Sequence, residues 1–288
     1  MTKLMKIFPA LAIAVLATGA SAAGTSVVGS SHDLSATGKD VVGAAGQAQN
    51  QVCVYCHMPH NAVNIGAPLW NRSNSTTAFT MYSAANSSTF QLNAADTNTA
   101  ARPVGPVSLA CLSCHDGVTA FNSLNQGPMI DLDNNLLPSS YTFKTPATTA
   151  GTVTTAGVTV TNMAGASAPG AGSADLGTDL TNDHPISFTF DTALATLKGV
   201  TLRDPSTALV DNGTSGALVI LRAGTTGSQT IATQMLFTKP GAGVQNQLEC
   251  ASCHEPHMQG VVTSAASNYP FLIKSNQNSN LCLTCHNK

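Results

Sequence analysis

The sequence predicts a fold of mostly coil and short helices, organised around covalently attached groups, with a small β-rich insert. Three observations support this prediction. A five-residue pattern containing two cysteines occurs four times, and helical 3.6-residue periodicity is scarce outside these patterns because glycine and proline interrupt the chain often. A Thr-, Ala- and Gly-rich stretch with strand-length apolar runs separates the second copy from the third.

The repeated pattern is C-x-x-C-H, and its four copies use all eight cysteines. In a helical turn, positions i, i+3 and i+4 share one face, so two thiols can bond one porphyrin while the histidine meets its iron. Four covalent c-type haems are therefore predicted. Structural zinc and a disulfide framework are alternatives, but neither requires a histidine after every second cysteine. The predicted attachment residues and proximal ligands are Cys53, Cys56 and His57; Cys111, Cys114 and His115; Cys250, Cys253 and His254; and Cys282, Cys285 and His286.

The other four histidines equal in number the distal ligands that four irons need. They are His32, His60, His184 and His257. Methionine is the rival distal ligand and raises the reduction potential where it binds, and Met58 and Met258 lie close to the patterns. The equal counts favour two histidines on every iron.

His60 follows its own proximal histidine too closely to bind the same iron. The second axial position lies across the porphyrin plane, beyond the reach of a side chain three residues after His57. Pro59 disfavours helical backbone at Met58, so we expect the chain to turn and carry His60 to another haem. The same C-H-x-P-H sequence recurs at 253–257, which predicts two stacked haem pairs.

The remaining distal candidates lie in predicted loops. Pro185, directly after His184, favours an extended or turned backbone that presents the ring outward. His32 lies near the expected start of the mature chain, in a segment able to cover a haem. The adjacent Asp33 and Asp183 are interpreted as solvated loop carboxylates rather than as partners that orient the rings.

The first 22 residues have the features of a secretory signal peptide. Lys3 and Lys6 precede the apolar run 7–17, and Ala20-Ser21-Ala22 offers a cleavage site. No later apolar stretch has the length of a membrane span. We therefore expect an exported protein, extracellular or at the cell surface, with the periplasm as the alternative.

Composition excludes one class of partner. Charged residues make up 9% of the chain, against about 25% in an ordinary soluble domain. The formal net charge is −2 and becomes −4 without the two signal-peptide lysines, because ten basic and fourteen acidic residues remain. A basic nucleic-acid-binding surface is not expected.

Four segments follow from these features: the signal peptide 1–22, an N-terminal dihaem lobe 23–137, the insert 138–245 with His184, and a C-terminal dihaem lobe 246–288. An antiparallel β subdomain is the interpretation of the insert, and a low-complexity segment is the alternative. Loops or flat strands are expected at 145–177. Strands are expected at 186–190, 200–202, 217–222 and 229–238.

These residues resemble the multihaem c-type cytochromes of metal-reducing bacteria. The resemblance rests on the four C-x-x-C-H patterns, two of them followed by P-H, and on the segments Ser31-His32-Asp33 and Asp183-His-Pro-Ile-Ser-Phe188. The greatest similarity is to outer-surface tetrahaem cytochromes of the OmcE type, which polymerise into extracellular filaments. The resemblance implies a multihaem cytochrome c fold and says little about residues 138–245.

The resemblance also implies a set of distal ligands that is complete only when subunits are joined in a row. Its pairs, distal histidine first, are His60 with His286 of an adjacent copy, His257 with His115, His32 with His57, and His184 with His254. In a monomeric alternative, His60 caps the His115 haem and His257 caps the His286 haem. The sequence alone leaves both sets open.

The expected function follows from coordination. Iron capped by two imidazoles has no vacant position for a substrate, so we expect electron conduction and not enzymatic catalysis. A conductive homopolymer carrying electrons to other cytochromes or extracellular metal oxides is the leading expectation, and a monomeric periplasmic or surface shuttle is the alternative. A multihaem oxyanion reductase is a third reading, and it requires an open iron.

Overall fold

The computed structural model describes residues 27–35, 41–43, 52–65, 67–94, 96–121, 123–125, 141–143, 151–155, 158–162, 174–210, 229–238, 246–257, 271–274 and 276–287. Coil predominates among them, and the longest helix has 10 residues. The prediction of a mostly coil chain with short helices is confirmed. The expected signal peptide and Met258 lie outside the described residues.

The helices are short and several coincide with the cysteine patterns. The α-helices are α1 (Pro106–His115), α2 (Thr192–Leu197), α3 (Ile231–Gln234) and α4 (Cys282–Cys285). The 3₁₀ helices are η1 (Cys53–Tyr55), η2 (Leu180–Asn182), η3 (Gly199–Thr201), η4 (Cys250–Ser252) and η5 (Gln277–Ser279). No helix in the described ranges has the length and apolar character needed to cross a membrane.

Three small antiparallel sheets of two strands each are present among the described residues. Strand β1 (Val41–Gly43) pairs with β2 (Tyr141–Phe143), and β3 (Gly151–Thr155) forms a hairpin with β4 (Val158–Asn162). Strand β5 (Phe188–Thr189) pairs with β6 (Gln247–Leu248), placing Phe188 opposite Leu248. Only the β3–β4 hairpin lies wholly inside the predicted insert. The β5–β6 pair joins the insert to the C-terminal lobe.

Two strand predictions within the insert are wrong. Residues 229–238 contain the helix α3, because Thr230 and Thr233 form a capping box in which each side chain accepts a hydrogen bond from the other's backbone N–H. Residues 199–201 form η3, and only Leu202 makes a β-bridge, with His286. The strand predicted at 186–190 is reduced to β5, and 217–222 lies outside the described residues.

The main apolar core draws on all parts of the described chain. Leu194, Ile231 and Met235 from the insert pack with Leu92 from the N-terminal lobe and Leu248 from the C-terminal lobe. Burying an apolar side chain of this size stabilises a fold by about 1.5–3 kcal/mol. The described part of the insert therefore packs against both cysteine-bearing lobes.

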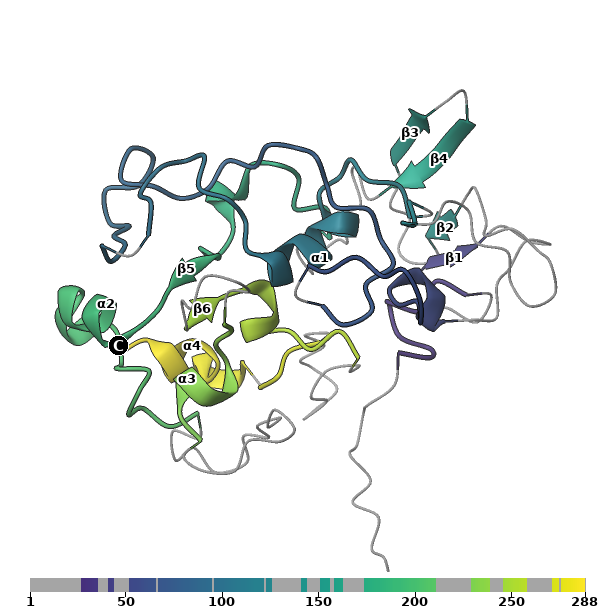
Figure 1. Cartoon of the computed structure of the whole chain (residues 1–288). Helices are drawn as coiled ribbons and strands as arrows, with labels where there is room; N and C mark the ends of the chain where they lie inside the picture. Colours follow the sequence, from purple (N-terminus) through teal and green to yellow (C-terminus); the bar gives the residue numbers. More distant parts are fainter. Residues whose placement is uncertain are drawn as a thin grey trace, which may run out of the picture.

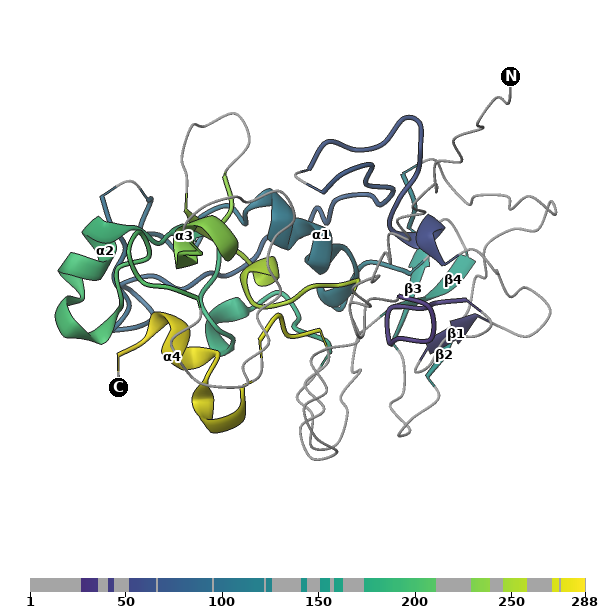
Figure 2. The same cartoon turned by 90° about the horizontal axis from the view of Figure 1, so that it is seen from below.

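The cysteine-bearing helices are spread along the molecule. Figures 1 and 2 show α4 and α2 beside the carboxyl terminus at one end, α1 in the middle, and strands β1 to β4 at the other end. Helices α1 and η4 pack against each other. The patterns are thus distributed over the length of the fold.

Candidate haem-binding sites

Each C-x-x-C-H pattern forms a helical turn that ends at its histidine. The backbone N–H of His57 donates to the carbonyl of Cys53 at 2.8 Å, and the equivalent bonds at His254 and His286 measure 3.1 and 2.9 Å. The copy that ends at His115 forms the last turn of α1. The i, i+3, i+4 geometry expected from the sequence is therefore adopted at all four places.

All eight cysteines are free thiols. Cys53 and Cys282 are exposed, and the other six are partly buried. In the described part of the chain, no group of three or more His, Cys, Asp or Glu side chains converges as a metal site requires. The thiols are thus placed in pairs on helical turns rather than gathered into one cluster.

Cysteines of consecutive patterns are neighbours in space. The neighbouring pairs are Cys56 with Cys114, Cys111 with Cys250, and Cys253 with Cys285. The two thiols of the middle pair influence each other's pKa in opposite directions. Burial raises the pKa of the Cys56 thiol to about 12, and Cys114 adds to the rise. The four patterns therefore follow one another in space in the order they have in the sequence.

Distant chain segments hold the backbone of every proximal histidine. β-Bridges join His57 to Trp70, His254 to Leu272 and His286 to Leu202. The carbonyl of His115 accepts a hydrogen bond of 2.9 Å from the N–H of Leu176. Each predicted iron ligand is thus fixed by its own helical turn and by a second segment.

Three imidazole pairs lie at similar separations. The ring centroids of His57 and His257 are 5.9 Å apart, and the planes are inclined by 15°. The rings of His32 and His115 are 6.1 Å apart, and those of His184 and His286 are 6.4 Å apart. In every pair, one ring belongs to a C-x-x-C-H turn and the other is a predicted distal ligand.

These separations match two histidines that share one metal ion. A histidine nitrogen binds a transition metal at about 2 Å. Adding about 1 Å from each nitrogen to its ring centre places the two centroids about 6 Å apart. The donor set and its spacing therefore fit bis-histidine haem iron at three of the four turns.

The hydrogen bonds of the rings leave the second nitrogen of each as a metal ligand. The bonds from Nδ1 run from His57 to the Pro68 carbonyl (2.7 Å), His115 to the Ala174 carbonyl (2.7 Å), His32 to the Pro256 carbonyl (3.2 Å), His184 to the Pro185 carbonyl (2.9 Å) and His257 to the Glu255 carboxylate (2.7 Å). A carbonyl oxygen only accepts, so Nδ1 carries the proton and Nε2 of the neutral ring keeps its lone pair. Such bonds orient metal-binding histidines.

Burial keeps one of these pairs in the neutral, metal-binding form. It lowers the pKa of His32 to about 4, with the neighbouring His115 as the second cause. Burial is also the main cause of the lowered pKa of His115. Phe271 stacks on the His32 ring with a centroid distance of 4.1 Å. Both rings are therefore uncharged at neutral pH, as ligation requires.

A buried donor beside His57 also fits the edge of a haem. The indole ring of Trp70 packs edge-on against the His57 ring at 6.0 Å, and Trp70 is 9% exposed. Its indole N–H is buried without an acceptor in the described ranges. A buried polar group normally has a partner, and a haem propionate provides one.

The ring neighbours differ from both ligand sets considered above. His257 lies beside His57, His32 beside His115, and His184 beside His286. His60 and His254 are exposed, and neither has another imidazole in ring contact within the described residues. Met58, the rival ligand, is 8% exposed, and its side chain is buried in the protein.

The environment of Asp33 differs from the sequence-based interpretation, and a different carboxylate orients a predicted distal ring. Asp33 is fully buried, and it accepts hydrogen bonds from the N–H groups of Gly29 (2.7 Å) and Ser35 (3.0 Å) in its own loop. The interpretation of Asp33 as solvated is therefore wrong. Glu255 bonds the His257 ring, and its position inside C-H-x-P-H was the signal in the sequence.

The chain matches no protein-family model, and no curated protein is significantly similar to it. The resemblance to multihaem cytochromes thus rests on the C-x-x-C-H and C-H-x-P-H residues and on the two histidine loops alone.

Proposed function

We propose that this protein is an exported tetrahaem c-type cytochrome that conducts electrons outside the cell and polymerises into a filament. The observation that carries the proposal is the set of three imidazole pairs with centroids 5.9–6.4 Å apart, each beside a turn with two free thiols. When bound, haem supplies a one-electron iron couple at each turn. The protein's own residues hold and space these groups.

The roles of the residues follow from the geometry. The cysteines fix each haem on its turn, and the proximal histidines are held by helical and bridging hydrogen bonds. The distal histidines His32, His184 and His257 would supply the second imidazole to the iron and would keep substrates from reaching it. Because histidine pairs favour lower potentials than Met/His pairs, the protein suits low-potential respiratory electrons.

The order of the turns supports conduction along the molecule. Cysteines of consecutive patterns are neighbours, and helices α1 and η4, which carry Cys111 and Cys250, pack against each other. These residues would hold four haems in sequence order, which would supply a row of one-electron centres along the molecule.

The two histidines that have no imidazole in ring contact within the described residues support polymerisation. His60 is exposed on the chain after η1, and His254 needs a second ligand if it binds haem iron. We infer that His60 of one copy caps the His254 haem of the next copy. This assignment replaces His286 as the acceptor site that the resemblance implied.

The second candidate function is a monomeric shuttle, in which every distal histidine binds a haem of its own chain. The observation favouring it is that His257, from the second C-H-x-P-H segment, lies beside His57 in the first. A reciprocal exchange would place His60 on the His254 haem of the same chain. The filament and the monomer thus use the same pair, His60 and His254, either between two copies or within one chain.

Export and redox partners complete the proposal. The signal-peptide features of residues 1–22 support export to the cell surface or beyond. Extracellular metal oxides or other cytochromes are the proposed electron acceptors. Neither a nucleic acid nor a membrane span forms part of the proposal.

The test compares the secreted wild-type protein with His60→Ala. Electron microscopy should show thin wild-type filaments with four low-spin haems per chain. His60→Ala should give single subunits in which four haems remain attached and one is high-spin. The matched control is His184→Ala, because His184 has an imidazole partner within its own chain. It should produce one high-spin haem without loss of filaments.

Other outcomes decide against parts of the proposal. A monodisperse wild-type monomer with four low-spin haems favours the shuttle. A resting wild-type protein with a high-spin haem favours a catalyst with an open iron. Absence of covalent haem in protein secreted by a host that assembles c-type cytochromes would overturn the cytochrome proposal altogether.

A further inference from the structure

Two buried charges of opposite sign lie at successive junctions between the haem-binding turns. Arg72 bonds Ser113 in the second turn and follows Asn71, which bonds Cys56 in the first turn. Glu249 directly precedes the third turn and bonds Ser108 in α1, which carries the second turn. Arg72 and Glu249 are 1% and 3% exposed, respectively. Only 9% of the chain is charged, and charged side chains are rarely buried without a specific role.

Arg72 is held at the first junction by neutral groups. Its Nη1 donates to the Phe121 carbonyl at 2.6 Å, and Nη2 donates to the carbonyls of Ser113 and Ala120 at 2.8 and 2.7 Å. Its Nε donates to the hydroxyl of Ser113 at 3.0 Å. The N–H groups of Arg72 therefore have hydrogen-bond acceptors, but none of these four acceptors carries a negative charge.

Arg72 lies between the attachment residues of two turns. Its side chain bonds Ser113, the residue before Cys114. The backbone N–H of Asn71, the residue before Arg72, donates to the carbonyl of Cys56 at 2.9 Å. These cysteines belong to the first and second patterns, and both pack on the cluster that contains Tyr55 and Phe121. A positive charge at this place faces both of the haems that the two turns would carry.

Glu249 is held at the second junction by three donors from three segments. Its carboxylate accepts hydrogen bonds from the hydroxyl of Ser108 in α1, from the hydroxyl of Ser187 at 3.0 Å, and from the backbone N–H of Ser252 in η4. Each donor presents a hydrogen to the oxygens, which is the arrangement for an ionised, acceptor-only carboxylate.

Two backbone features adapt the fold to this carboxylate. A Cβ atom at Gly105, the residue before α1, would overlap the Glu249 carboxylate. Ser187 has a positive φ of 58°, which is uncommon for a residue other than glycine, and its hydroxyl also accepts from the N–H of Gly105 at 2.8 Å. The seat of Glu249 is thus a built feature of the junction.

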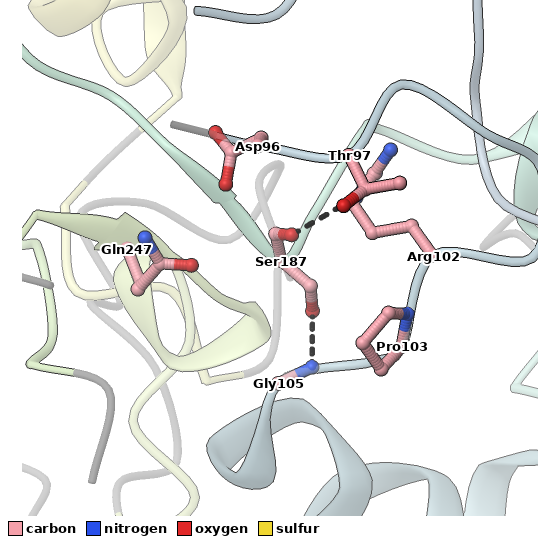
Figure 3. Close-up of a pocket in the computed structure, with 7 residues that line it drawn as sticks. All are labelled: Asp96, Thr97, Arg102, Pro103, Gly105, Ser187 and Gln247. Carbon is pink, nitrogen blue, oxygen red and sulfur yellow. Dashed lines mark hydrogen bonds between the residues drawn. The ribbon is translucent and has the colours of Figure 1, made fainter. Parts of the chain in front are cut away.

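A small pocket adjoins the seat of Glu249. Figure 3 shows Gly105, Ser187 and Gln247 lining it together with Asp96 and Arg102. Its volume is about 80 Å³. Ser187, which bonds Glu249, therefore also lines this pocket.

The sign of each charge determines its effect on a neighbouring haem. Ferric haem carries one more positive charge than ferrous haem, so a nearby cation favours the ferrous form and raises the reduction potential. A nearby anion does the opposite. In a low-dielectric interior these interactions are weakly screened.

We propose, on the basis of the cytochrome function above, that Arg72 and Glu249 are tuning residues that create a step in reduction potential along the haem array. Arg72 raises the potentials of the first and second haems, and Glu249 lowers those of the second and third. The step makes the η1 end the favoured electron acceptor relative to the third haem. Both residues act through the haems and make no contact with a substrate.

The test is a potentiometric titration of the haem-loaded protein with single charge-neutralising variants. Glu249→Gln should shift part of the titration upward, and Arg72→Gln should shift part of it downward. Buried charges change neighbouring ionisation equilibria by about tenfold or more, which corresponds to about 59 mV for a one-electron couple. Arg72→Lys, which keeps the charge, is the matched control and should shift the titration less than Arg72→Gln.

A purely structural role predicts a different result. Loosened packing admits water at either site and moves both variants in the same direction, so only opposite shifts support tuning. Where a variant fails to fold, the haem methyl NMR signals of the wild-type protein provide the second measurement. The haem at Cys250 must then titrate below the haem at Cys53, and the reverse order would overturn the inference.

The haem count separates this inference from the proposed function. A protein without covalent haem would refute the cytochrome proposal. Four attached haems whose potentials are unchanged in Glu249→Gln and Arg72→Gln would refute only the tuning role.

Discussion

The two C-H-x-P-H segments share four of five residues but differ in where their last histidine goes. The ring centroids of His257 and His57 are 5.9 Å apart, and the Nδ1 of His257 donates to Glu255 at 2.7 Å. His60 is exposed and has no imidazole neighbour in the described part of the chain. The segments differ at the x position, which is Glu255 in one and Met58 in the other.

The x residue directs the chain after each turn. Met58 is buried, and its N–H donates to the Leu69 carbonyl at 2.8 Å. The N–H of Glu255 makes the equivalent bond to the Phe271 carbonyl at 2.7 Å, so the two segments differ in the x side chain, which is buried in the case of Met58. Glu255 instead bonds both the N–H and the ring of His257, which folds the segment back on itself. The same spacing thus serves one internal ligand and one external ligand.

The largest expected effect comes from removing the internal ligand. His257→Ala leaves the His57 haem without its distal imidazole, so one of four haems should become high-spin by electron paramagnetic resonance. His60→Ala should affect a different haem, and the double variant should therefore show two high-spin centres. A fully low-spin His257→Ala protein would contradict the assignment of His257 to the His57 haem.

Truncating the buried x residue should reduce stability without changing the spin state. Met58→Ala removes a buried side chain, and such changes cost about 2–5 kcal/mol. Urea unfolding followed by circular dichroism measures the change in the free energy of unfolding. His60→Ala, an exposed control in the same segment, should stay within about 0.5 kcal/mol when measured on monomers. Equal stability of the two variants would argue against the anchoring role of Met58.

Neutralising Glu255, the x residue of the second segment, should weaken the binding of His257 to iron without destabilising the fold. The Glu255 hydrogen bond is the main cause of the raised pKa of His257, and burial opposes it. Loss of such a partner weakens metal binding by about 10–100-fold. Glu255→Gln should therefore let carbon monoxide displace His257 from ferrous haem more readily, as measured by absorption spectroscopy. Glu255→Asp keeps the charge, so carbon monoxide should displace His257 less readily in this variant than in Glu255→Gln. Identical carbon monoxide binding by the wild-type protein and both variants would exclude this role of Glu255.

The smallest expected effect lies outside both segments, in the loop that carries His184. The hydroxyl and N–H of Thr181 donate to Asp179 and lower the pKa of its carboxyl. A depressed pKa contributes stability above the unfolded value of about 3.9, and this stability is lost as the pH falls through the folded value. Asp179→Asn should therefore lower Tm slightly at pH 7 and have no effect near pH 2. A deficit that persists at pH 2 would exclude ionisation as its cause.

The sequence predicted the parts of the structure that depend on short-range chemistry. The four turns, their histidines and the mostly coil character follow from C-x-x-C-H and from frequent glycine and proline. The β-branched run around Thr230 was misleading, because hydroxyl capping between Thr230 and Thr233 favours a helical turn that a strand pattern does not reveal. Local side-chain hydrogen bonds decided the outcome there.

Ligand partners depended on long-range packing and were not encoded locally. The sequence singled out His32, His184 and His257 as distal candidates but not the rings they approach. The rings of His184 and His286 are in contact although the two residues are far apart in the chain. The backbone of His286 also pairs with Leu202, another residue distant in sequence. Arg72 and Glu249 were also missed, because the sequence does not show which of its few charged residues are buried.

The segments that secure the histidine backbones have a consequence for biogenesis. Trp70, Leu176 and Leu272 follow the turns they secure, whereas Leu202 precedes the turn ending at His286. Ribosomes make chains from the amino terminus, so three cysteine pairs emerge before their anchoring segment exists. The fourth emerges after it. Under the proposed function, enzymatic attachment of porphyrin would precede anchoring at the first three turns and would compete with folding at the last.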